Sequence, residues 1–228
     1  MRRREILGGL AGLAVGARAA RAAAEDAGAL PVVLELFTSE GCSSCPPADA
    51  LLGRLAARAG TIALAWHVDY WNGPAWTDRF ATPLATARQR GYAAALRQEV
   101  FTPALVIDGQ TMVVGSDAQA VAAAIATSAR LTAPVTLERA GDALRARIAA
   151  PPGARAVLAF YDRLHVRQIG GGENSGQKLR EFNVVRAAMT LDATGPVLPL
   201  PAPAAGQGAA LLIQAADLRV IGAARIEP

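Results

Sequence analysis

Both cysteines of this 228-residue chain, Cys42 and Cys45, fall within the six-residue segment CSSCPP. The apolar, β-branched run of residues 31–37 (PVVLELF) precedes them and is typical of a buried strand. The two prolines after Cys45 suit the first turn of a helix, where a missing N–H loses no hydrogen bond. We therefore expect the cysteine pair at a strand-to-helix junction, which constrains the fold more than any other feature of the sequence.

This position gives the C-x-x-C pair a redox interpretation. A thiolate at Cys42 would meet the free N–H groups and the dipole at the start of the helix, and both lower a thiol pKa. Cys45, expected one turn inside the helix, is placed to resolve a mixed disulfide formed at Cys42. A C-x-x-C motif in an α/β setting indicates redox chemistry. Two cysteines exclude any four-cysteine zinc or iron–sulfur site within one chain.

The elements that follow the pair indicate an α/β domain over residues 31–130. Buried strands are expected at 61–66, 104–107 and 111–114, and helices at 83–98 and 117–129. The dipeptide Asp108-Gly109 predicts a tight hairpin between the last two strands. Alternation of strands and helices predicts a parallel sheet, to which the hairpin adds an antiparallel edge.

The second half of the mature chain is predicted to be rich in strands instead. Six short apolar runs, separated mostly by turn residues, predict a small antiparallel β-sandwich-like domain over residues 134–228, packed on the first. The Pro-rich stretch of residues 195–205 is expected to be a loop. The segment Gly170–Gly176 (GGGENSG) lacks the G-K-[ST] end of a phosphate loop and predicts a flexible hairpin loop. Whether this loop reaches the cysteine pair is left open.

The first 24 residues have the composition of a signal peptide. Arg2 to Arg4 precede a short apolar stretch and small-residue cleavage sites, and RREIL is similar to a twin-arginine export signal, with an ordinary Sec signal as the alternative. Removing this leader leaves eighteen basic and eighteen acidic residues, so nothing predicts nucleic-acid binding. We expect an exported, periplasmic or secreted protein without a membrane span after cleavage.

Four segments resemble a known family. LELFTSEGCSSCPPAD, HVDYWNGPAWTDRF, FTPALVIDG and GENSGQKLREFNVVR are similar to an uncharacterised family of secreted bacterial proteins, a domain of unknown function with a thioredoxin-like fold. In that fold, a cis-proline before the third strand faces the C-x-x-C pair. The resemblance implies that Pro103 is this residue and that the backbone of Thr102 contacts the substrate. Glu40, close to the pair, is expected to oppose a thiolate.

The sequence therefore favours an exported thiol–disulfide oxidoreductase that acts on protein or small-molecule thiols and disulfides without a cofactor. One alternative is a non-catalytic binding module with a structural disulfide. Another is a Cu(I) carrier in which His67 joins both cysteines as a ligand. Tyr70, Trp71 and Trp76 either line a substrate groove or pack within their own long loop. The oligomeric state is left open.

Overall fold

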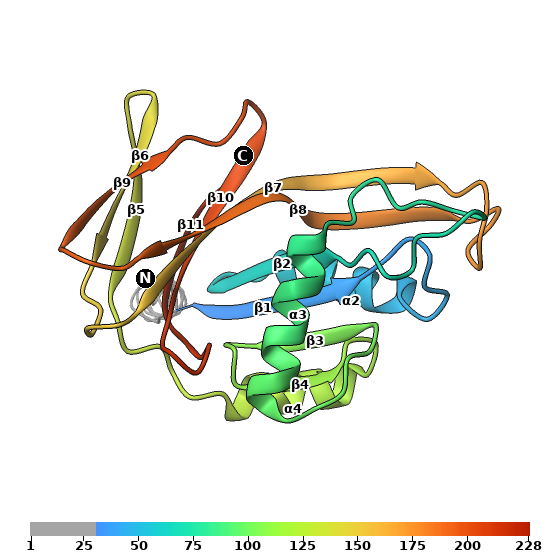
Figure 1. Cartoon of the computed structure of the whole chain (residues 1–228), viewed down its shortest axis with the longest axis horizontal. Coiled ribbons are helices and arrows are strands. Elements are labelled where there is room, and N and C mark those ends of the chain that lie inside the picture. The colour runs from blue at the N-terminus through green and yellow to red at the C-terminus, as the bar shows by residue number, and fades with distance from the viewer. Residues whose placement is uncertain (1–30) are drawn as a thin grey trace, which may run out of the picture.

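The computed structural model describes residues 31–228, so the expected signal peptide lies outside the described residues. In chain order the elements are β1 (Val32–Thr38), α2 (Pro46–Ala56), β2 (Thr61–His67), α3 (Pro83–Leu96), β3 (Ala104–Ile107), β4 (Thr111–Val114), α4 (Ala118–Thr127), β5 (Val135–Ala140), β6 (Ala143–Ile148), β7 (Arg155–Gln168), β8 (Lys178–Asp192), β9 (Val197–Pro201), β10 (Gln207–Gln214) and β11 (Val220–Ile226). Figure 1 shows one long mixed sheet of eight strands and a smaller sheet of three at one end.

The first half of the chain builds the β2-β1-β3-β4 part of the large sheet. Strands β1 and β2 are parallel along their whole length, as predicted. Strand β3 is antiparallel to β1, whereas simple alternation predicted a parallel strand. The difference arises because α3 crosses the sheet instead of running back along it, so β3 starts at the end where β2 stops (Figure 1).

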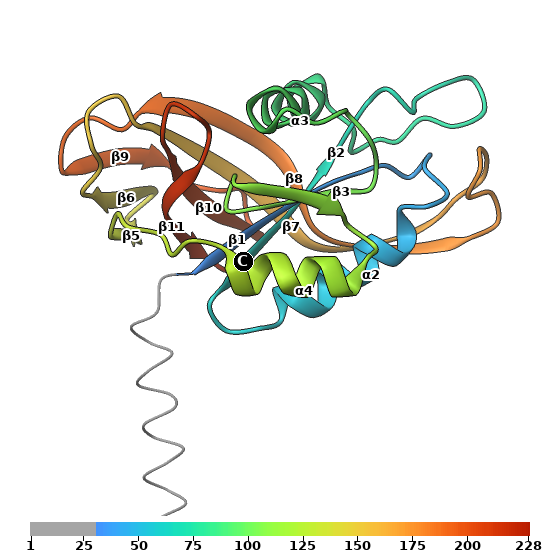
Figure 2. The same cartoon turned by 90° about the horizontal axis from the view of Figure 1, so that it is seen from below.

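Helices cover both faces of this part of the sheet (Figure 2). Helix α3 packs on one face through Tyr92, which lies in the same apolar cluster as Phe37 and Trp66. Helices α2 and α4 cover the other face and share a second cluster with Leu34 and Leu36. The run in β1 is buried on both faces and so has no polar alternation.

The second half does not form a separate β-sandwich, because four of its strands extend the same sheet. Strand β8 pairs with β2 through Ala65 and Val184, and β7, β10 and β11 follow outward. The small sheet, in the order β5-β6-β9, packs on these outer strands and encloses an apolar cluster of its own. Two sheets do pack on each other in the second half of the chain, as predicted. The larger of them is not separate, because it continues the sheet of the first half.

Two segments of the second half depart from expectation in detail. The Pro-rich stretch expected to be a loop contains β9, which pairs with β6 at the edge of the small sheet, where proline is tolerated. Strands β7 and β8 are 14 and 15 residues long, longer than predicted, and form an arm that ends at the Gly170–Gly176 segment. That segment is a hairpin loop, as predicted. Among residues 31–228 no helix is long and apolar enough to span a bilayer.

Candidate functional site

The cysteine pair lies between β1 and α2, as the sequence predicted. Cys42 and Cys45 form a disulfide, with their Cα atoms 5.4 Å apart. Cys45 is the N-cap of α2, directly before the helix, rather than one turn inside it, and Pro46 and Pro47 occupy the first two helical positions. The turn is closed by the backbone N–H of Cys45, which donates to the carbonyl oxygen of Cys42. Both sulfur atoms therefore belong to the turn that starts the helix.

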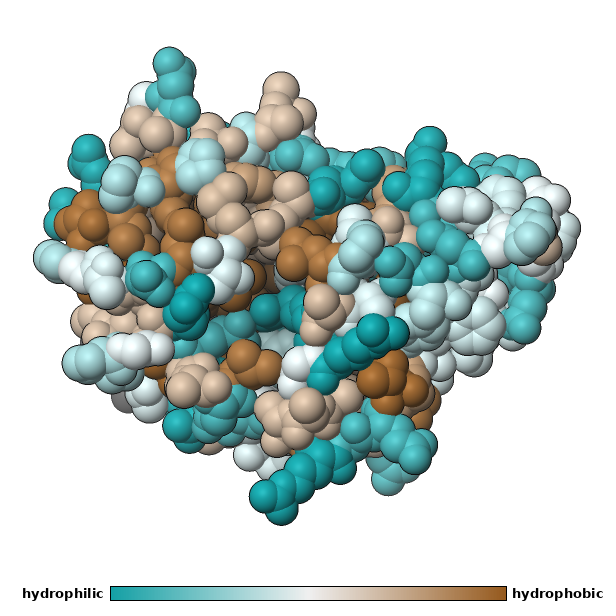
Figure 3. Space-filling model, viewed as in Figure 1, coloured by the Kyte–Doolittle hydropathy of each residue, from teal (hydrophilic) through white to brown (hydrophobic). Residues whose placement is uncertain are grey.

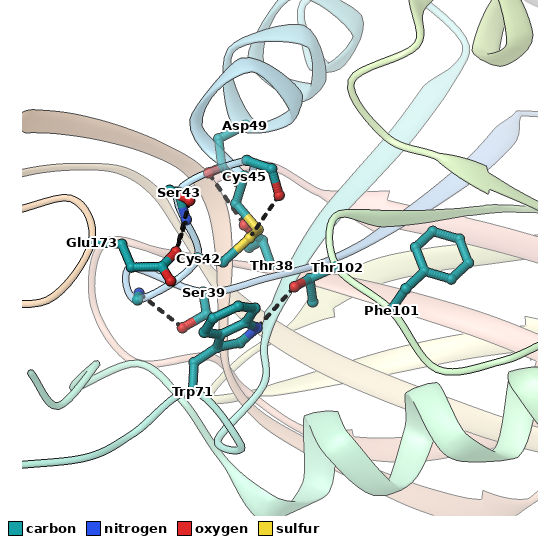
Figure 4. The surroundings of a disulfide bond; sticks show 12 residues. Thr38, Ser39, Cys42, Ser43, Cys45, Asp49, Trp71, Phe101, Thr102 and Glu173 are labelled. Atoms are coloured by element: carbon teal, nitrogen blue, oxygen red, sulfur yellow. Dashed lines mark hydrogen bonds between the residues drawn. A yellow bond between two sulfur atoms is a disulfide. The ribbon is translucent and has the colours of Figure 1, made fainter.

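The Thr102–Pro103 element lies beside this turn. The Thr102–Pro103 peptide bond is cis, as the resemblance implied, and Pro103 is buried. The Thr102 hydroxyl accepts a hydrogen bond of 2.8 Å from the indole N–H of Trp71. Trp71 also contacts the cysteine turn, since a Cβ placed on Gly41 would lie 3.1 Å from the Trp71 Cβ. Figure 4 shows the indole N–H of Trp71 directed at Thr102, with the disulfide close by.

The predicted aromatic residues of the long loop have three different environments. Trp71 remains 38% exposed next to the disulfide. Tyr70 is 40% exposed and donates from its hydroxyl to the side chain of Gln89 on α3. Trp76 is half-buried and donates from its indole N–H to the carboxylate of Glu40, at 2.8 Å. The structure thus brings Trp71 to the disulfide, whereas Trp76 packs against Gly170–Gly172 of the Gly170–Gly176 segment.

Glu40, whose charge was expected to oppose a thiolate, is paired with an arginine. Its side chain is buried, and one carboxylate oxygen lies 2.7 Å from Arg167 Nε of β7. The pKa of Glu40 is raised, first by burial and then by the nearby Asp78, against the opposing effects of Trp76 and Arg167. The guanidinium also lies over the ring of Trp76. The negative charge that would oppose a thiolate is therefore countered by a cation from the second half of the chain.

The β7–β8 loop, residues 169–177, supplies contacts that sequence reasoning had left open. The buried side chain of Asn174 donates from Nδ2 to the carbonyl oxygens of Glu40 and Cys42, each at 2.9 Å. Glu173 accepts hydrogen bonds from the backbone N–H and the hydroxyl of Ser43, at 3.2 and 2.7 Å. The only feature in the sequence that pointed to these contacts was the polar, glycine-rich segment GENSG. Its partner cannot be read from local spacing, because 132 positions separate Asn174 from Cys42.

A group of buried titratable side chains lies in the adjoining core. His67 Nδ1 is 2.7 Å from the Asp78 carboxylate. Burial alone would lower the pKa of His67, but the charge and hydrogen bond of Asp78 raise it to about 9. Burial raises the pKa of Asp49 to about 7 and that of Glu181 to about 8. Asp49 lies in the first turn of α2 and accepts a hydrogen bond from the hydroxyl of Thr38.

The structure does not gather a metal-ligand set around the cysteines. The ring nitrogen Nδ1 of His67 is taken by Asp78, and Cys42 and Cys45 are bonded to each other. Within residues 31–228 no group of three or more His, Cys, Asp or Glu side chains is arranged to hold a metal ion. The geometry therefore gives no support to His67 as a third ligand beside the cysteine pair.

Comparison with known proteins identifies relatives without a described activity. A family model described as "Protein of unknown function (DUF1223)" matches residues 33–214. An X-ray crystal structure of a protein from Agrobacterium tumefaciens, a structural genomics target, is 31% identical to the chain, with a TM-score of 0.75. The match covers 87% of this chain and 95% of that one. A search of curated proteins finds no match.

Proposed function

The chain belongs to the DUF1223 family of proteins of unknown function, and we propose that it is an exported thiol–disulfide oxidoreductase with a thioredoxin-like core. One observation carries the proposal: the Cys42–Cys45 disulfide lies in the turn that starts α2. There, the positive end of the α2 dipole favours a thiolate on Cys42 after reduction. The β2-β1-β3-β4 order, with α3 on one face and α2 and α4 on the other, supports the thioredoxin-like assignment.

In the exchange that this site would perform, two substrate thiols supply the electrons that reduce the Cys42–Cys45 disulfide. A substrate thiolate attacks Cys42 Sγ, the Cys42–Cys45 bond breaks, and the electron pair leaves on Cys45 Sγ, which takes up a proton. A second substrate thiolate attacks the substrate sulfur of the mixed disulfide and releases the Cys42 thiolate. The substrate is oxidised to a disulfide and the protein is reduced to a dithiol. The reverse sequence, started by Cys42 and resolved by Cys45, reduces a substrate disulfide.

Residues next to the pair support a polypeptide or small thiol as substrate. Trp71 is partly exposed beside the cysteine turn, Tyr70 lies next to Trp71, and Thr102 accepts the hydrogen bond of the Trp71 indole. In the space-filling view of Figure 3 the end that carries these residues is hydrophilic to near neutral, whereas strongly apolar residues gather toward the other end. Aromatic rings and backbone groups, rather than an aliphatic patch, are thus available to hold a substrate.

Substitution of Cys42 tests the proposal directly. We expect Cys42→Ser to abolish exchange with a fluorescent dithiol or disulfide peptide, because the attacking sulfur is gone. Cys45→Ser should instead accumulate a mixed disulfide at Cys42, detectable by intact mass, because no residue is left to resolve it. Exchange by Cys42→Ser at the wild-type rate would show that the mechanism is wrong.

A second candidate function, a binding module with a structural disulfide, is favoured by the burial of the pair. Cys42 and Cys45 both have 0% of their surface exposed. The reduction potential separates the two functions. A value between about −120 and −200 mV indicates an oxidant or isomerase, one near −270 mV a reductant, and one below about −300 mV a structural bridge.

A further inference from the structure

Within the cysteine turn the two serines are exposed, whereas the two cysteines are completely buried. Ser43 and Ser44 face solvent, whereas Cys42 and Cys45, on either side of them, have no exposed surface. Disulfide exchange requires the attacking thiolate to reach one of the two sulfur atoms. The closed arrangement seen here therefore has to open before a substrate can react.

The β7–β8 loop contacts this turn through Glu173 and Asn174, and Trp71 contacts it at Gly41. The side chain of Asn174 points into the turn and is completely buried, with its two hydrogen bonds on the carbonyls of Glu40 and Cys42. Gln177 of the same loop donates to Asn174 Oδ1 at 3.1 Å, which fixes the orientation of the amide. Figure 4 shows Glu173 approaching Ser43 from the opposite side to Thr102.

These contacts to the cysteine turn are few and polar. Asn174 and Glu173 contribute four hydrogen bonds between them, and Glu173 is exposed to solvent. Gly172 and Gly176 have φ values of +69° and +82°, a region that glycine enters without steric cost. Moving the loop away from the turn breaks these hydrogen bonds, which water can replace, and also separates Gly170–Gly172 from the ring of Trp76, on which they pack.

We propose that the β7–β8 loop is a gate over the Cys42–Cys45 disulfide and that Asn174 is the positioning residue that holds it shut. This inference rests on the proposed function, since it assigns a means of control to the same redox pair. A thiol reaches Cys42 Sγ only after Asn174 leaves the carbonyls of Glu40 and Cys42. A partner that binds the loop or competes for those carbonyls would thereby license the exchange.

The gate is tested by the rate at which dithiothreitol reduces the disulfide of the full-length mature protein, followed by alkylation and intact mass. In the wild type the rate should level off at high dithiothreitol concentration, because opening becomes limiting. Asn174→Ala removes two hydrogen bonds from the closed state and should raise the rate at low dithiothreitol about tenfold. The matched control is Ser175→Ala, at an exposed position of the same loop, which should leave the rate unchanged.

Further variants keep the test decisive if Asn174→Ala folds poorly. Glu173→Ala alters an exposed side chain and should raise the rate severalfold, with an unchanged circular dichroism spectrum. A wild-type rate that stays proportional to dithiothreitol, together with rates in both variants within twofold of the wild type, would overturn the gate. Peptide exchange could still proceed in that case, so the proposed function would stand.

The opposite combination is also informative. If the variants are reduced faster as expected but neither they nor the wild type exchange with any peptide, the gate stands and the oxidoreductase proposal fails. A disulfide that resists dithiothreitol in every variant would overturn both.

Discussion

At the scale of single residues, Glu173 determines the charge next to Cys42. Its carboxylate accepts two hydrogen bonds from Ser43, the neighbour of Cys42, and these bonds lower the pKa of Glu173. In the reduced protein, a Cys42 thiolate would therefore form close to a fixed negative charge. The helix N-terminus and Glu173 act on that thiolate in opposite directions.

Replacement of Glu173 by glutamine should lower the pKa of the Cys42 thiol, because it removes a like charge and keeps a hydrogen-bond acceptor. We expect an acid dissociation constant about threefold larger, measured by the ultraviolet absorbance of the thiolate in the reduced protein. Glu138→Gln, an exposed substitution in β5, is the control and should have no effect. A raised or unchanged thiol pKa in Glu173→Gln would contradict this account.

At the scale of elements, the packing of α2 on β8 joins the two halves of the chain next to the cysteines. A Cβ on Gly53 of α2 would lie 2.5 Å from the ring of Phe182 in β8, so the helix approaches the strand closely only because this residue is glycine. Gly91 of α3 is different, since a Cβ there would make an ordinary contact at 3.4 Å with Leu218.

The two helix glycines should consequently respond to alanine with opposite signs. Gly53→Ala should destabilise the protein by about 1–3 kcal/mol, because the added methyl forces α2 away from β8. Gly91→Ala should stabilise it by up to about 1 kcal/mol through helix propensity. Urea denaturation midpoints of both variants measure the effects, and a stabilised Gly53→Ala would refute the close packing.

At the scale of the whole molecule, the continuous sheet makes the two halves one unit. Strand β8 pairs with β2 at Ala65 and Val184, at the edge where a separate first domain would end. We expect a single unfolding transition in urea, with coincident curves from tryptophan fluorescence and far-ultraviolet circular dichroism. All three tryptophans lie in the first half, so two independent domains would give curves that do not coincide.

The buried titratable group also acts on the whole molecule, through the pH dependence of stability. The folded-state pKa values of Asp49, Glu181 and His67, about 7, 8 and 9, lie above the unfolded values of about 3.9, 4.3 and 6.5. Each group therefore contributes stability that is present below its unfolded pKa and is lost as pH rises through its folded pKa. Asp78, whose pKa is lowered, acts in the opposite sense, at acid pH.

The melting temperature should therefore fall as the pH rises from about 5 to 9. Glu181→Gln should flatten this fall, whereas the exposed Glu138→Gln should leave it unchanged. Thermal melts followed by circular dichroism measure both. A melting temperature that rises over this range would show that the pKa values of these side chains are not raised in the folded protein.

The sequence by itself determined the local features of this protein. The strand before Cys42, the prolines that start α2, the Asp108-Gly109 hairpin and the loop at residues 170–176 all depend on neighbouring residues, whose spacing is visible in the chain. The cysteine pair at a strand-to-helix junction could be placed for the same reason.

Only the tertiary structure decided how distant segments meet. The β8 pattern indicates a strand but not its partner, because the open edge of β2 offers the same backbone groups to any strand. The contacts of Asn174 with Cys42, and of Arg167 with Glu40, likewise depend on the length and direction of the β7–β8 arm. Access to the disulfide is set by these long-range contacts, which is why the motif alone could not show that its sulfur atoms are covered.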